Sequence, residues 1–442
     1  MIGLGVYSYS PYLLKCWMAS WRGKYLNNWR YDNHTQKLVR DAEEREFWLP
    51  DQWREYQDDK LKQIIHSSKK TAFYQQMGYS FKGNKSSQFP ILSKELLREN
   101  NQDFVINTIS KKKLFHDHTS GSSGTPVSVW LDEKSVKFWY ALVERRWRNW
   151  YDVSRDDKWA IFGGQLITPQ KRTKPPFWVE NYSMKQLYCS IYHISSRSVR
   201  YYVEKLTQFK PAYIYGYASA LYSLAYEMEK QNLLVPSLKV VISNAEPLHN
   251  HQRELISTVF NAPCKDTYGL AEIVMGAGEC EFNQMHLWPE TGIWEVLDKK
   301  GVQVKNGVSG RFVSTGLINT CMPLLRYNTG DHIAIDKNYS CKCGRTMPVI
   351  IKIDGRTDDL IVTPDGRSIG RLDTVFKSDL NIKEAQIIQN SANSLIIRIV
   401  PARKYSKIDE EKLENALKLR LGNMEIFFEL VNNIPKNNSG KF

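Results

Sequence analysis

The sequence has no run of about 18 apolar residues, the length that a membrane-spanning helix needs. The most suggestive stretch, from Met1 to Trp21, is interrupted by Lys15 and has no basic segment ahead of an apolar centre. Neither a spanning helix nor a secretory signal is therefore predicted. We expect a cytoplasmic protein.

Regularly spaced cysteines are also missing. The chain has seven cysteines, an odd number, and they are scattered without the framework of a disulfide-rich domain. This usage is typical of reduced thiols in a reducing compartment, so disulfides are not expected. No internal repeat or low-complexity linker is present either. Domain boundaries must therefore be inferred from changes of pattern.

The chain does have the length, composition and charge of a multidomain folded protein. Its 442 residues, 42% hydrophobic and 24% charged, exceed what one core usually organises. A formal charge of +14 favours anionic partners. Nucleotides, coenzyme A, nucleic acid and an anionic membrane surface all fit that description, and charge alone does not choose among them.

Hydrophobic periodicity predicts an α/β protein with three regions. Strand-like runs at 158–162, 212–215, 238–242 and 310–314 alternate with helix-like stretches at 136–150, 219–231 and 250–259. Such alternation indicates partly parallel, mixed sheets. A shorter strand and helix pattern after Gly355 predicts a small separate α/β domain. The expected division is an N-terminal helical region (1–85), a large core (86–353) and a small C-terminal domain (354–442).

A serine- and glycine-rich segment in the core predicts a phosphate-binding loop. Gly121 and Gly124 permit positive φ, so successive backbone N–H groups can face an anion, and the hydroxyl groups add donors. No Gly-Lys-Ser/Thr follows, so this is not a Walker loop. Taken alone, such a segment is more often a surface turn. The candidate loop consists of Thr119, Ser120, Gly121, Ser122, Ser123, Gly124 and Thr125.

Five further segments follow the loop in a fixed order. They are Ser243–Pro247, Asp266–Glu272, Leu324–Asp331, Asp354–Asp359 and Pro435–Lys441. Together with the loop they resemble the adenylate-forming, AMP-binding ligases. Within these, the set is similar to the phenylacetate-CoA ligase family and its branch found in capsular polysaccharide biosynthesis. The resemblance runs from about residue 40 to the end and implies an adenylation core followed by a small mobile domain.

The resemblance implies two half-reactions. ATP and Mg²⁺ convert a small-molecule carboxylate into its acyl-adenylate and pyrophosphate, and the acyl group then passes to coenzyme A or to an amine. The implied nucleotide site contains the phosphate loop, Ala245, Glu246, Pro247, Tyr268, Gly269 and Asp331. A ring followed by glycine can stack on adenine, although an isolated Tyr-Gly is more often core. Asp331 can accept hydrogen bonds from the ribose hydroxyls.

Three charged residues are the candidate catalytic groups. Glu272 is a hard oxygen ligand at the family's magnesium position. Arg356 can donate charge-assisted hydrogen bonds to ribose or the α-phosphate. Lys441, beside Gly440, matches the mobile lysine that stabilises charge as the carboxylate attacks. Out of context, a lysine near a chain end is usually solvated.

A second constellation combines three cysteines and one histidine. Cys280, His286, Cys341 and Cys343 would form a closed tetrahedral set, which suits structural zinc. The spacings alone leave free cysteines equally plausible. Family members with the same pattern carry zinc at this place, so the resemblance implies a zinc site joining the two segments.

Other readings remain open at this stage. The sequence has Gly124-Thr125-Pro126 where relatives often have Gly-Lys-Pro, so a positive charge near the phosphates is missing. A catalytically silent scaffold that binds a polyanion or a membrane surface is the alternative function. It gives no chemical reason to retain Glu272, Asp331, Arg356 and Lys441 together. No nucleic-acid module is recognised. Peripheral membrane association and a homodimer stay open.

Overall fold

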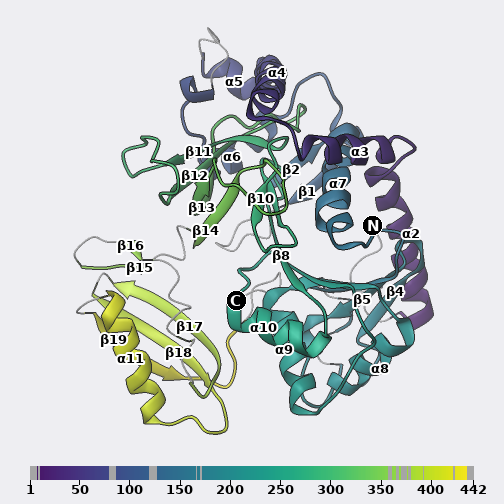
Figure 1. Cartoon of the computed structure of the whole chain (residues 1–442), viewed down its shortest axis with the longest axis vertical. Coiled ribbons are helices and arrows are strands. Elements are labelled where there is room, and N and C mark those ends of the chain that lie inside the picture. The colour runs from purple at the N-terminus through teal and green to yellow at the C-terminus, as the bar shows by residue number, and fades with distance from the viewer. Residues whose placement is uncertain are drawn as a thin grey trace. The chain divides into compact units, whose positions relative to one another are not determined.

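A computed structural model gives the fold of the chain (Figure 1). It describes residues 7, 10–78, 86–118, 127–165, 167–169, 172–356, 361–364, 368–369, 376, 380–391, 393–421 and 424–435. The chain divides into two compact units. The larger consists of Met1–Thr329 and Ala334–Lys352, and the smaller of Gly330–Ile333 and Ile353–Phe442.

Helices dominate the N-terminal part of the larger unit. The α-helices are α2 (Tyr12–Arg30), α3 (Thr35–Arg45), α4 (Pro50–Ser68), α5 (Ala72–Gln76) and α6 (Lys94–Glu99), and the 3-10 turns are η1 (Ser86–Gln88), η2 (Asn101–Phe104) and η3 (Lys111–Lys113). Helix α4 buries Trp53, Leu61 and Ile65 along one face, at the spacing of an amphipathic helix. Ser93 caps α6, because its Oγ accepts a hydrogen bond from the Leu96 N–H at 3.1 Å.

The phosphate-loop segment lies between two short paired strands. β1 (Phe115–His118) and β2 (Ser128–Leu131) are antiparallel. β1 begins at Phe115, shortly after Lys111–Lys113 forms the turn η3. The candidate loop residues between β1 and β2 lie outside the described residues.

Twelve of the described strands form one mixed sheet, in the order β11-β12-β13-β14-β10-β9-β8-β7-β6-β3-β5-β4. From β8 to β5 each pair is parallel, whereas β4, β9 and β10 pair antiparallel with their neighbours. This confirms the prediction of mixed α/β architecture. The strands are β3 (Trp159–Gly163), β4 (Trp178–Asn181), β5 (Gln186–Ser190), β6 (Tyr213–Tyr217), β7 (Val240–Asn244), β8 (Cys264–Gly269), β9 (Gly276–Glu279), β10 (Met285–Leu287), β11 (Gly292–Leu297), β12 (Gly310–Gly316), β13 (Tyr327–Asp336) and β14 (Val349–Arg356).

Both faces of the parallel part are buried. Helices α8 (Val199–Phe209), α9 (Ala218–Lys230) and α10 (Asn250–Phe260) cover one face (Figure 1). Val241 packs into that core, whereas Val240 and Ile242 belong to a cluster with Trp159 and Tyr213. The sequence of a strand that is buried on both faces is a continuous apolar run, and for this reason β7 could be predicted from the sequence. Helix α7 (Glu133–Trp147) packs against α3, and the short turns η4 (Asn149–Tyr151), η5 (Tyr182–Met184) and η6 (Ile191–His193) complete the larger unit.

The smaller unit has its own core. β17 (Ile382–Ser391), β18 (Ser394–Pro401) and β19 (Glu425–Leu430) form a sheet in that order, and α11 (Lys407–Leu421) connects β18 to β19. Leu395, Ile397 and Ile399 alternate onto one face of β18, and Leu413 and Leu417 lie one helical turn apart, so the two sets meet in one cluster. A two-stranded ribbon, β15 (Ile361–Val362) and β16 (Ser368–Ile369), precedes them.

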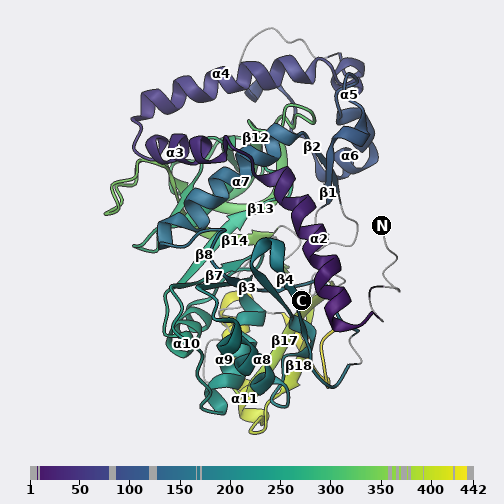
Figure 2. The same cartoon turned by 90° about the vertical axis from the view of Figure 1, so that its right-hand side faces the viewer.

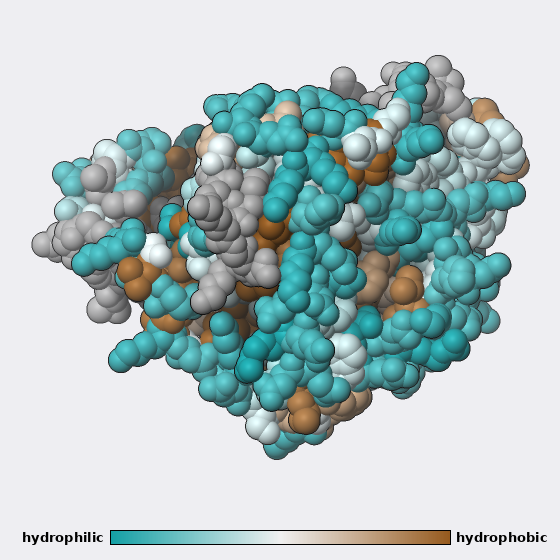
Figure 3. All heavy atoms as spheres, turned by 90° about the horizontal axis from the view of Figure 1, so that it is seen from above, coloured by the Kyte–Doolittle hydropathy of each residue, from teal (hydrophilic) through white to brown (hydrophobic). Residues whose placement is uncertain are grey.

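The surface of the protein that Figure 3 shows is mostly hydrophilic, as its amino-acid composition leads us to expect. Hydrophobic residues show there in several separate patches. Within the described residues, no helix combines the length and the hydrophobicity that crossing a membrane requires.

Candidate active site and metal centre

Two of the predicted segments meet at one edge of the parallel sheet. β6 ends at Tyr217, which lies beside Asn244 at the end of β7. The segment 245–247 directly follows β7, and Tyr268 and Gly269 end the neighbouring strand β8. Open α/β sheets bind ligands outside the carboxyl ends of their strands. The fold therefore brings both candidate nucleotide-binding segments to the expected edge.

The segment after β7 is strained and anchored. Ala245 has φ 62°, in the left-handed region that non-glycine residues rarely occupy. The next residue, Glu246, accepts a hydrogen bond from the Ser219 N–H through Oε2 at 3.0 Å, at the positive N-terminal end of α9. Such strain persists only where the surroundings hold it, and it often marks ligand sites.

Asn244 is a candidate that the sequence reasoning missed. Its Oδ1 atom is buried and has no hydrogen-bond partner among the described residues. An unsatisfied buried acceptor costs about 1–3 kcal/mol. The atom is thus suited to a donor on a ligand, such as the amino group of adenine. Its position between an apolar strand and Ala245 was the available sequence signal.

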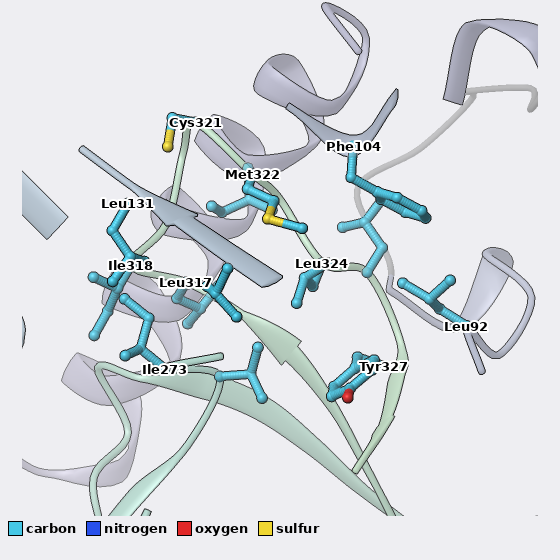
Figure 4. Close-up of a cluster of buried hydrophobic side chains, with 14 of the residues drawn as sticks. Leu92, Phe104, Leu131, Ile273, Leu317, Ile318, Cys321, Met322, Leu324 and Tyr327 are labelled. Carbon is cyan, nitrogen blue, oxygen red and sulfur yellow. The ribbon is translucent and has the colours of Figure 1, made fainter. Parts of the chain in front are cut away.

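Glu272 lies in a tight turn after β8. The Ile273 N–H donates to the Leu270 carbonyl at 3.0 Å, and Ile273 has φ 49°, a true outlier for a β-branched residue. The Ile273 side chain is buried in the cluster drawn in Figure 4, and this burial holds the turn. Glu272 is only 2% exposed. The turn therefore fixes a carboxylate a few residues beyond Tyr268.

Tyr327 supports this carboxylate and was also missed. Its hydroxyl donates to Glu272 Oε1 at 2.7 Å, and Figure 4 shows its ring at the edge of the same cluster. Among the described residues no lysine or arginine forms an ion pair with Glu272. A buried carboxylate is unfavourable without a counter-charge, and its oxygens are ligands that Mg²⁺ prefers. Glu272 therefore fits the predicted magnesium role.

The remaining predicted residues are only partly described. Asp331 lies in β13, is 5% exposed and belongs to the smaller unit. The backbone of Arg356 ends β14, but its side chain lies outside the described residues, as do Thr119–Thr125 and Lys441. The roles assigned to these residues remain predictions.

Asp266, two residues before Tyr268, has an unusual environment. Its Oδ1 accepts hydrogen bonds from Ser243 Oγ at 2.8 Å and the Thr267 N–H at 2.9 Å. Burial, and next the carboxylate of Glu279, raise the pKa of Asp266 to about 7. Arg253 holds Glu279 through two contacts of 2.7 Å. Asp266 therefore stays neutral more easily than an ordinary aspartate.

The four predicted zinc ligands lie together. One ligand atom each from Cys280, His286, Cys341 and Cys343 falls within 4.8 Å of all the others. The Cys280 and Cys341 sulfur atoms are 3.7 Å apart, and Cys343 Sγ is 3.3 Å from His286 Nε2. Tetrahedral zinc with Zn–S bonds of about 2.3 Å separates sulfur ligands by about 3.8 Å. The thiols are free rather than bonded to each other, and their spacing fits such an ion.

Neighbouring groups orient these ligands. His286 Nδ1 lies 3.0 Å from the Met347 carbonyl, a contact that places the ring proton on Nδ1 and leaves Nε2 for a metal. Burial lowers the pKa of His286 and favours the neutral ring. Arg345, two residues after Cys343, pairs with the fully buried Glu46 at 3.0 Å. The cysteine loop is thereby tied to the end of α3.

Comparisons with known proteins define the class. The solved structure of a 2-hydroxyisobutyryl-CoA ligase in complex with 2-HIB-AMP is similar with a TM-score of 0.65 and 20% identity, over 86% of this chain and 87% of that one. This chain therefore has the fold of the adenylate-forming CoA ligases, and the predicted fold class is confirmed.

Sequence comparisons show which proteins with this fold the chain resembles. Protein CapK of Staphylococcus aureus is 26% identical over 99% of this chain and 97% of its own length. A phenylacetate-coenzyme A ligase of Aromatoleum evansii is 27% identical over 62% of each chain. Residues 361–442 match the CapK C-terminal domain model. The chain is thus similar in sequence to CapK and to the phenylacetate-CoA ligases, which confirms the predicted resemblance and supports the prediction of an adenylate-forming ligase.

Proposed function

We propose that this protein activates a small-molecule carboxylic acid as its acyl-adenylate and then transfers the acyl group to coenzyme A. The observation that carries the proposal is the strained turn that buries Glu272 beyond the Tyr268-Gly269 end of β8. CoA ligases among the homologues and structural neighbours support the same reaction. An amine acceptor is the alternative for the second step.

The first half-reaction forms a mixed anhydride. A carboxylate oxygen of the acid attacks the α-phosphorus of ATP, and the bond to the bridging oxygen of pyrophosphate breaks. Tyr268 stacks on adenine, Asn244 Oδ1 accepts from its amino group, and Asp331 accepts from the ribose. Glu272, oriented by Tyr327, would hold Mg²⁺, and the ion would supply positive charge to neutralise the phosphates. The phosphate loop, Arg356 and Lys441 stabilise charge in the transition state.

The second half-reaction transfers the acyl group. The sulfur of coenzyme A attacks the acyl carbonyl carbon, its thiol proton passes to solvent water, and AMP departs with the electrons of the anhydride bond. The full-length likeness to CapK and the Gly124-Thr125-Pro126 loop favour an acid from capsule, polysaccharide or secondary-metabolite biosynthesis. The burial of Glu272 in this turn disfavours a silent scaffold, because a scaffold has no need for a buried carboxylate that lacks a counter-charge.

A structural zinc ion is the second part of the proposal. The donor set of Cys280, His286, Cys341 and Cys343 and its spacing support a closed site without an open position for catalysis. Such an ion would pin β10 to the segment between β13 and β14. It would stabilise the fold and take no part in the reaction.

Pyrophosphate exchange tests the function. Purified protein with Mg²⁺, labelled pyrophosphate and ATP is screened against arylacetic, hydroxy, amino and sugar acids. We expect at least one acid to support exchange, and Glu272→Gln to lower the rate by about 100-fold because the magnesium ligand is weakened. The control Glu254→Gln changes an exposed glutamate on α10. Exchange with no acid, or an unchanged rate in Glu272→Gln, contradicts the proposal.

A further inference from the structure

Helix α2 carries a row of large apolar side chains that the described chain leaves exposed. Leu13, Trp17 and Trp21 are 75%, 63% and 66% exposed, and Leu14 and Tyr25 are each 44% exposed. At about 100° per residue these five fall within about a third of the helix circumference. We name them the α2 outer face. Isolated exposed apolar residues are ordinary, but a contiguous row with two tryptophans marks an interaction surface.

The opposite face fixes the orientation of the helix. Gly23 is buried, and a Cβ there would lie 2.3 Å from Asn181 Oδ1, so the backbone sits flush on β4. The Tyr182 N–H donates to Ser20 Oγ at 2.9 Å, and Asn27 Nδ2 donates to the Ser183 carbonyl at 3.0 Å. Figure 2 shows α2 running along the outside of the unit beside β4. These contacts hold the outer face away from the sheet.

Charge identifies the partner. The first 31 residues contain no aspartate or glutamate, but they contain Lys15, Arg22, Lys24 and Arg30. Arg22 and Lys24 are exposed, so basic groups lie beside the outer face. Helices that carry tryptophan and leucine on one side and basic residues around it are suited to lie in the plane of a membrane interface, where the basic groups attract anionic lipids.

We propose that the α2 outer face docks the protein on an anionic lipid bilayer. Trp17 and Trp21 enter the headgroup region, and Arg22 and Lys24 meet the lipid phosphates. The attachment is peripheral, because no described helix can span the bilayer. A docking site for a neutral protein surface would not require an acid-free segment, and charge complementarity therefore favours the lipid. This inference is independent of the chemistry proposed above.

Vesicle co-sedimentation tests the docking. The full chain is mixed with vesicles of phosphatidylglycerol and phosphatidylcholine, or of phosphatidylcholine alone. We expect binding to the anionic vesicles only, weakened at about 0.5 M NaCl by screening. Trp17→Ser/Trp21→Ser should lower the affinity by about tenfold or more. Arg22→Gln/Lys24→Gln should lower it about fivefold for each charge removed and reduce the salt dependence.

A control variant tests whether the effect is specific to the α2 outer face. Leu234→Ser/Phe282→Ser removes two exposed apolar residues outside α2, 79% and 46% exposed, and should bind like the unchanged protein. Thermal unfolding verifies that each variant is folded. No binding to anionic vesicles overturns the proposal, as does equal binding by the tryptophan variant. Loss of a vesicle-independent dimer in that variant would overturn it in favour of a subunit interface.

Discussion

At the scale of single residues, Asp266 shows how a buried carboxyl group can influence stability. Burial and the carboxylate of Glu279 disfavour its charged form and raise its pKa from 3.8 to about 7. In the unfolded chain the group ionises near pH 4. The folded state therefore holds the proton more tightly. The resulting stability is fully present below the unfolded pKa and is lost as pH rises towards 7.

Asp266→Asn should remove this dependence, because asparagine imitates the neutral acid. We expect the variant to gain stability over the unchanged protein as pH rises from 4.5 to 7.5, by about 3 kcal/mol. Denaturant unfolding at the two pH values measures the difference. Asp156→Asn is the control, because it changes an exposed aspartate. Its stability should differ from that of the unchanged protein by the same amount at both pH values. If the stability difference between Asp266→Asn and the unchanged protein is also equal at the two pH values, the pKa of Asp266 is not raised.

At the scale of elements, much of the fold was predictable from local pattern. The stretches 219–231 and 250–259 were predicted as helices and correspond to Ala218–Lys230 and Asn250–Phe260. Apolar residues at helical spacing and uninterrupted apolar strands carry that signal along the chain itself. The sequence could also predict that the segments at the carboxyl ends of β7 and β8 lie close together, because parallel strands place these ends at one edge of the sheet.

The parts of the candidate site that were not predicted depend on tertiary contacts. Tyr327 reaches Glu272 across 55 residues of sequence, and Arg345 reaches Glu46 across 299. The unsatisfied Oδ1 of Asn244 is visible only when all its neighbours are placed. No residue type or spacing encodes such contacts, since they result from how separate elements pack.

The predicted zinc ion would join β10 to the loop between β13 and β14, so its removal should destabilise the contact between these elements. Cys341→Ser/Cys343→Ser should abolish stoichiometric zinc and lower the free energy of unfolding by about 3 kcal/mol, since a structural ion stabilises only the folded state. Elemental analysis and denaturant unfolding measure both effects. Cys321→Ser, at a buried thiol outside the cluster, should retain zinc. Purified protein without zinc, or zinc retained by the double variant, would refute the site.

At the scale of the whole molecule, the chain is two compact units, and it crosses from one to the other within β13 and again within β14. The last boundary falls between Lys352 and Ile353, inside β14. Gly355, just beyond it, has φ 100°, a conformation that side chains strongly disfavour. A segment of this kind can absorb a rotation between units, as the resemblance to adenylate-forming ligases implies. The two half-reactions would then use different orientations of the smaller unit.

Lys441 tests the assignment of the two half-reactions, because the sequence predicts it in the small C-terminal domain and we assign it to the first half-reaction alone. Lys441→Ala should slow pyrophosphate exchange by about 100-fold, since a positive charge is lost where phosphate charge develops. Transfer to coenzyme A from preformed acyl-adenylate should change by no more than about threefold. Lys418→Ala, at an exposed lysine of the same unit, is the matched control and should leave both steps unchanged. Equal slowing of both half-reactions by Lys441→Ala would show that the lysine supports the fold or both orientations, and would remove its assignment to adenylation.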